Sequence, residues 1–126
     1  MPKVLVIEDD PELVSLLCTL LTMEEYSVVT PRNHQIKEVL RLFLDELPEV
    51  ALVDVNLSLG SGLDLVRQIR AQPELKDTRI LMTSGLDMER ECMKSGADAF
   101  IQKPFMADEL LSQIDEINQQ TRNFQN

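Results

Sequence analysis

Charged side chains follow directly after three short apolar segments of this sequence. Asp54 comes after the apolar run 50–53, an acidic run at residues 8–10 follows a second apolar segment, and Lys103 follows a third. Open α/β sheets carry their chemistry at the carboxyl ends of parallel strands. If the three segments are neighbouring parallel strands, several carboxylates and one ammonium group meet in a single pocket.

Three carboxylates in such a pocket, those of Asp9, Asp10 and Asp54, cannot all stay ionised unless a cation offsets their repulsion. The motifs offer only oxygen ligands, and few of these are carboxylates. This favours Mg²⁺, because the ion keeps several waters and takes its remaining ligands from a phosphate. The motifs offer no soft ligand, which argues against zinc. The acidic cluster therefore predicts a bound Mg²⁺.

Asp54, next to such a metal, has the chemistry to attack a phosphoryl group in line and form an aspartyl phosphate. Lys103 would neutralise one phosphoryl oxygen, and a hydroxyl at the end of the fourth predicted strand would hydrogen-bond another. Ser84 and Thr83 both fit that position, but adjacent side chains of a strand point to opposite faces, so only one of them can reach the pocket. Gly85 leaves space for the phosphate.

The elements that must position these groups alternate between strand and helix. The apolar runs predict strands at residues 4–7, 26–30, 50–53, 79–83 and 99–102. The helical spacing of apolar side chains predicts helices at residues 11–21, 33–47, 63–71, 87–95 and 108–119. Right-handed crossovers then favour one doubly wound, five-stranded parallel sheet of the flavodoxin or CheY kind. In strand order 2-1-3-4-5, the switch point lies between the strands that lead to the three carboxylates.

Composition limits the class of protein. A chain of 126 residues is long enough for one domain and too short for two. Its formal net charge of −10 predicts a surface that repels nucleic acid and anionic membranes, so we expect no direct binding to either.

No segment approaches the length of a membrane span, and the chain enters a strand without a signal peptide, which predicts a cytoplasmic protein. Cys18 and Cys92 lack metal or redox spacing and are predicted to be packing residues.

The carboxyl-terminal end has a different composition from the rest. Residues 118–126 are rich in Gln and Asn, a composition typical of a frayed tail or the start of a linker. We therefore expect the domain to occupy residues 1–119 and residues 120–126 to be a tail or the beginning of a linker.

The residues described so far resemble the receiver domain of two-component response regulators, a CheY-like family. The resemblance extends from about Lys3 to Gln119. It rests on the alternation of strands and helices and on four separated motifs, Glu8-Asp9-Asp10, Asp54, Ser84-Gly85 and Lys103-Pro104-Phe105.

The resemblance implies roles for the acidic residues. Asp54 would be the phosphoacceptor, which takes a phosphoryl group from a sensor histidine kinase or phosphotransfer protein, or from acetyl phosphate. Asp10 would be a direct Mg²⁺ ligand, Asp9 a ligand through water, and Asn56 would contribute its backbone carbonyl. Lys103 would pair with the phosphoryl group.

The resemblance also implies a switch. Ser84, the residue before Gly85, would be the hydroxyl that moves onto the phosphoryl group. Phe100 would be the aromatic residue that turns inward, without the hydroxyl that Tyr often supplies there. The bond between Lys103 and Pro104 would be cis. The surface formed by the fourth helix, fifth strand and fifth helix would then regulate a downstream protein or a fused output domain. We expect the chain to be a monomer or a weak dimer.

Three other classes of protein share parts of this pattern. A pseudo-receiver that binds partners without phosphorylation is disfavoured by the intact acidic and basic residues. A phosphatase of the haloacid dehalogenase type needs a second Asp two residues after its nucleophile, where this chain has Asn56. A flavin mononucleotide carrier needs a phosphate-cradling loop where this chain has Glu8 and two further acids. We therefore expect a signalling domain that is not an enzyme, beyond catalysing its own phosphorylation and dephosphorylation.

Overall fold

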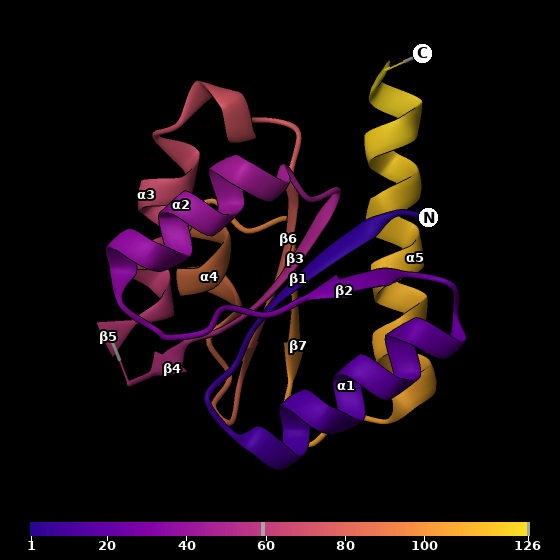
Figure 1. The fold of residues 1–126 in the computed structure, drawn as a ribbon. Helices are drawn as coiled ribbons and strands as arrows, with labels where there is room; N and C mark the ends of the chain where they lie inside the picture. The colour runs from indigo at the N-terminus through magenta and orange to yellow at the C-terminus, as the bar shows by residue number, and fades with distance from the viewer. Residues whose placement is uncertain (59, 126) are drawn as a thin grey trace.

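The computed structural model of the chain describes residues 1–58 and 60–125, with side chains described as far as Gln119. Leu59 of the predicted loop after Asp54 and Asn126 of the predicted tail lie outside the described residues. Figure 1 shows a central sheet with helices on both of its faces. This is the predicted doubly wound α/β fold.

The main sheet has five strands, all parallel to their neighbours. The strands are β1 (Lys3–Ile7), β2 (Ser27–Val29), β3 (Val50–Asp54), β6 (Arg79–Ser84) and β7 (Ala99–Gln102). Their order is β2-β1-β3-β6-β7, which confirms the predicted order. The remaining strands, β4 (Asn56–Leu57) and β5 (Gly60–Ser61), pair with each other in a separate antiparallel hairpin that the sequence did not predict.

Five α-helices alternate with the strands of the main sheet. They are α1 (Pro11–Met23), α2 (Ile36–Glu46), α3 (Gly62–Arg70), α4 (Glu89–Ser95) and α5 (Ala107–Gln125), with a short 3₁₀ turn at Pro73–Leu75. Helices α2, α3 and α4 bury side chains such as Phe43 and Cys92 against one face of the sheet. Helices α1 and α5 bury Leu17 and Ile114 against the other. None of the helices in the described part of the chain is long and apolar enough to span a membrane.

The helix boundaries differ from the prediction by one or two residues in α1, α3 and α4, and by more in α2 and α5. Helix α2 begins at Ile36 rather than near Asn33, because the Asn33 side chain instead accepts a hydrogen bond from the backbone N–H of Gln35 and forms a turn. It ends at Glu46, since Leu47 adopts a left-handed conformation with φ of 44°. Helix α5 continues to Gln125, past the predicted end near Gln119. Gln is a good helix former and Asn a weaker one that helices still contain, so the abundance of these residues did not mark a helix end.

Both faces of the main sheet are buried, which explains why the residues of the candidate site lie at one edge of it. Along β3, Ala51 and Val53 contribute to one hydrophobic cluster, and Val50 and Leu52 contribute to the other. A strand covered in this way has no polar face, so its functional groups lie at its carboxyl end. Asp54 is the last residue of that strand.

Candidate functional site

Lys103 joins two buried carboxylates at the carboxyl edge of the sheet. Its Nζ lies 2.7 Å from Glu8 Oε1 and 3.1 Å from Asp54 Oδ2. The two acidic residues are each only 6% exposed. These side chains come from the ends of β1, β3 and β7, so the structure brings together the strand ends that the sequence singled out. The result is a buried cluster of two carboxylates and one ammonium group.

The burial of this group changes its acid–base properties. Burial raises the pKa of Asp54, and the nearby Glu8 raises it further, whereas the hydrogen bond from Lys103 opposes the shift. Burial acts to lower the pKa of Lys103, but its hydrogen bonds to Glu8 and Asp54 outweigh that effect, and the pKa lies above its ordinary value. Lys103 is therefore held as a cation beside Asp54.

The raised pKa of Asp54 predicts a stability effect. The folded chain binds the Asp54 proton more tightly than the unfolded chain, whose pKa is near the model-compound value of 3.8. Ionised Asp54 therefore costs stability at neutral pH, and the cost disappears as pH falls through the folded pKa. We expect Asp54→Asn to raise the melting temperature at about pH 7 and to raise it less at about pH 4.

Thermal unfolding of the native chain and the Asp54→Asn variant at the two pH values measures this effect. Asp64→Asn is the matched control, because Asp64 pairs with Arg67 on the exposed surface of α3 and should change stability little at either pH. A lower melting temperature for Asp54→Asn at neutral pH would show that the pairing with Lys103 outweighs the cost of burial.

The backbone after Asp54 is held close to the start of α3. The amide of Asn56 donates to Asp54 Oδ1 at 3.3 Å, and the amide of Gly62 donates to the carbonyl of Val55 at 2.7 Å. A Cβ atom added at Gly62 would lie 2.1 Å from the backbone oxygen of Asp54. Only glycine fits there, a requirement that sequence reasoning did not identify.

Gly62→Ala should therefore destabilise the chain by about 3 kcal/mol, because neither backbone can move without shifting the other. Chemical denaturation with the native chain as reference measures the loss. Gly85→Ala is the matched control, since a Cβ at Gly85 would have nothing within 4 Å. Equal stability of the two variants would contradict the close approach at Asp54.

The acidic residues at the end of β1 make different contacts. Glu8 accepts the backbone N–H groups of Asp9 and Asp10 through Oε2, at 3.0 and 3.1 Å, while its other oxygen faces Lys103. Asp9 Oδ2 accepts the backbone N–H of Ser58, from the loop that follows Asp54. Asp9 therefore connects the end of β1 to the loop after β3.

Asp10, by contrast, has a structural role at the start of α1. It is exposed, and its Oδ1 accepts the backbone N–H of Glu12 at 3.0 Å as the N-cap of α1. The structure thus shows Asp10 as a helix cap and shows Glu8, joined to Asp54 through Lys103, as the member of the acidic run 8–10 beside the predicted phosphoacceptor. Asp10 stands directly before Pro11 at the first helical position, where its residue type is a natural cap, so the capping role agrees with the sequence.

The predicted switch residues lie on the two strands beyond Asp54. Ser84 is fully buried, and its Oγ accepts the backbone N–H of Leu86 at 3.1 Å. Thr83 is also buried and lies in register with Asp54. Phe100, on β7, is partly buried against the cluster formed with α2, α3 and α4. The backbone N–H of Lys103 donates to the Ser84 carbonyl at 2.8 Å, and the Lys103–Pro104 bond is cis, as the resemblance implies.

The structure agrees with the Mg²⁺ prediction only in part. Within the residues that the structure describes, no group of three or more His, Cys, Asp or Glu side chains is arranged to hold a metal ion. Mg²⁺ needs only one or two carboxylates, with waters and carbonyl oxygens in its remaining positions. Asp9 Oδ1 is buried without a hydrogen-bond donor, which is the kind of atom that a cation would satisfy. The donors present therefore fit Mg²⁺ without a three-carboxylate cluster.

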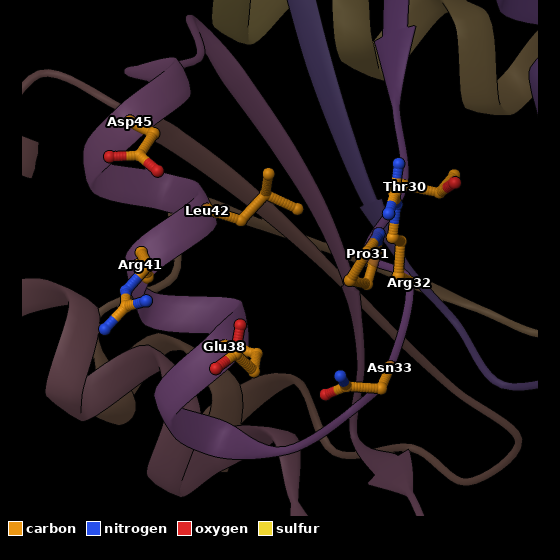
Figure 2. A pocket seen from close by; sticks show the side chains of 8 residues that line it. All are labelled: Thr30, Pro31, Arg32, Asn33, Glu38, Arg41, Leu42 and Asp45. Atoms are coloured by element: carbon orange, nitrogen blue, oxygen red, sulfur yellow. The ribbon is translucent and has the colours of Figure 1, made fainter.

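A separate hollow lies away from these residues. It has a volume of about 240 Å³ and lies between the segment after β2 and helix α2 (Figure 2). Leu42 points toward Pro31 across it, whereas Arg41 points away. None of the predicted site residues lines this hollow, so the candidate site remains the carboxyl edge of the sheet.

Comparison with known proteins gives a consistent result. The family model for the response regulator receiver domain matches residues 4–115. The transcriptional regulatory protein CpxR of Klebsiella pneumoniae is 34% identical over 115 residues, which are 90% of this chain and 48% of that protein. The chain spans about half the length of the curated relatives it matches.

Solved structures share the fold. Chemotaxis response regulator CheY4 of Vibrio cholerae has a TM-score of 0.84 and 27% identity, with 93% of this chain and 98% of that chain covered. The receiver domain of a sensor histidine kinase from Pseudomonas aeruginosa has a TM-score of 0.81 and 23% identity, with 93% and 97% covered. That protein holds a magnesium ion in its active-site cleft.

Proposed function

Because this chain belongs to the response regulator receiver domain family, we propose that it is a phosphorylation switch whose phosphoacceptor is Asp54. The observation that carries the proposal is the placement of one buried carboxylate, that of Asp54, 3.1 Å from the ammonium group of Lys103. A nucleophile needs a nearby positive charge to hold the oxygens of an incoming phosphoryl group. A sensor histidine kinase, a phosphotransfer protein or acetyl phosphate would be the donor.

The reaction assigned to Asp54 is an in-line transfer. A carboxylate oxygen of Asp54 forms a bond to phosphorus while the bond from phosphorus to the donor breaks. The leaving group is the imidazole of a phosphohistidine or the acetate of acetyl phosphate, and it takes the electron pair of the broken bond. Lys103 then shifts from the two carboxylates toward a phosphoryl oxygen. After this shift Lys103 still faces a negative charge, which the phosphoryl group then carries.

We assign the Mg²⁺ site to Asp9, Asp54 and the backbone carbonyl of Asn56, with Glu8 beside them. Asp10 caps α1, so the role of direct ligand that the resemblance implies for Asp10 passes to Asp9 in this proposal. Mg²⁺ would offset the negative charge that a phosphoryl group adds to these carboxylates. The magnesium ion in the P. aeruginosa receiver domain, a protein of the same fold, supports the assignment.

The conformational response would begin at Ser84 and Phe100. When the Ser84 hydroxyl moves onto the phosphoryl group, it would give up the hydrogen bond that it accepts from the Leu86 amide. Phe100 would follow inward and repack the surface of α4, β7 and α5. Such a change biases partner binding by the difference in affinity between the two states.

The partner of that surface would be a downstream protein or an output domain. The curated relatives are transcriptional regulators about twice as long as this chain, so we propose residues 1–119 as a receiver unit that acts through a further domain or a separate protein. This chain's own charge of −10 does not suit DNA, so any DNA contact would belong to the output. A cytoplasmic location and a monomer or weak dimer complete the proposal.

Binding of beryllofluoride, a stable mimic of a phosphoryl group, tests this function. In the presence of Mg²⁺, we expect shifts in the amide NMR signals of Ser84, Lys103 and β7, and no shifts when Mg²⁺ is left out. A chain that shows none of these shifts with both additives present would be a pseudo-receiver, which binds partners without phosphorylation.

A further inference from the structure

The loop between β2 and α2 brings a histidine to the acidic pocket. His34 Nδ1 lies 3.3 Å from Asp9 Oδ1, and each of the two side chains is 28% exposed. His34 precedes α2 by two residues and is 25 positions away from Asp9 in the sequence. The chemistry proposed above does not use this contact.

The two oxygens of Asp9 are held by different loops. Oδ2 accepts the backbone N–H of Ser58, whereas Oδ1 is buried and has no aligned hydrogen-bond donor. The nitrogen of His34 is within ion-pair distance of that second oxygen. A small rotation of the imidazole would therefore convert the contact into a hydrogen bond.

Hollows lie beside this pair, so the Asp9 side chain benefits from support. His34 and Ser58 line one hollow together, and His34 and Asp9 line another beside α1. A carboxylate that lines a hollow has room to change rotamer, and fixing it at the moment of metal binding costs conformational entropy. Contacts to both of its oxygens reduce that cost.

We propose that His34 is a positioning residue of the Mg²⁺ site, acting through the carboxylate of Asp9. Groups that hold a metal ligand in place commonly change metal affinity by about 10- to 100-fold. The inference rests on the proposed function in one respect, because Asp9 must bind Mg²⁺. It adds a residue of the β2–α2 loop to the determinants of that affinity.

Isothermal titration with Mg²⁺, without a phosphoryl donor, tests the inference. His34→Ala should weaken Mg²⁺ binding by about 10-fold. His34→Asn should restore most of the affinity, because its amide nitrogen can occupy the place of Nδ1. Gln35→Ala is the matched neighbour control, since Gln35 is exposed and its side chain makes no capping bond.

A kinetic measurement separates positioning from general damage. With acetyl phosphate as donor, His34→Ala should need about 10-fold more Mg²⁺ for half-maximal rate, while its rate at saturating Mg²⁺ stays near the native value. An equal loss at all Mg²⁺ concentrations would overturn the inference. Native or tighter Mg²⁺ binding by His34→Ala would also overturn it, as would an Asn variant no better than the Ala variant.

Asp9→Asn distinguishes a failure of the inference from a failure of the proposed function. If the native chain binds Mg²⁺, Asp9→Asn does not, and His34→Ala binds like the native chain, then only the role of His34 is wrong. If Asp9→Asn binds Mg²⁺ like the native chain, or the native chain binds none, then the metal site and the role of His34 are both wrong.

Discussion

Replacing Lys103 with Met should slow the phosphorylation of Asp54 by about 10²- to 10³-fold at saturating Mg²⁺, the loss typical of removing one charge-stabilising group from a reaction site. The ammonium lies 3.1 Å from the Asp54 carboxylate and 2.7 Å from that of Glu8. Its removal takes away the charge that would meet an incoming phosphoryl oxygen. It also leaves two buried carboxylates to repel each other, which raises the pKa of Asp54 further.

The initial rate of phosphorylation with acetyl phosphate measures this effect. Lys94→Met is the matched control, because Lys94 is exposed in the last turn of α4 and should leave the rate unchanged. Thermal unfolding verifies that the Lys103→Met variant is folded. A folded Lys103→Met variant with a rate within a few-fold of native would show that the ammonium has no part in the transfer.

The second large effect separates two neighbouring acidic residues. Asp9→Asn should weaken Mg²⁺ binding at least about 10-fold, or about 1.4 kcal/mol, whereas Asp10→Asn should leave the affinity near its native value. The Asp9 carboxylate extends to the loop after Asp54, whereas that of Asp10 caps α1. Asn caps a helix about as well as Asp, so the second variant should also keep its stability.

Isothermal titration of both variants with Mg²⁺ measures the difference. The two substitutions remove the same charge at adjacent positions, so each serves as the control of the other. A loss of binding in Asp10→Asn with native binding in Asp9→Asn would reverse the assignment and favour the ligand that the sequence pattern suggests.

The strand order and the edge that carries the site could be predicted because they depend on long patterns. Apolar runs covered on both faces identify parallel strands, and the crossover rules leave few ways to connect them. Placing Asp54 and Lys103 at strand ends was then enough to bring them together. No individual distance was needed for that conclusion.

What could not be predicted depends on atoms rather than on patterns. Three consecutive acids at a strand end are alike in type, and their spacing does not show that Glu8, rather than Asp10, is the one that faces Lys103. Gly62 is needed because two backbones meet at the end of β3. His34 reaches Asp9 from a distant loop, and no spacing in the sequence marks that contact.

Intact mass after incubation with acetyl phosphate tests the central claim most directly, with the native chain and Asp54→Asn compared in the presence and absence of Mg²⁺. We predict one added phosphoryl group on the native chain, dependent on Mg²⁺, and none on Asp54→Asn. A phosphoryl group that persists on the variant, or a native chain that acquires none, would contradict the assignment of Asp54 as phosphoacceptor.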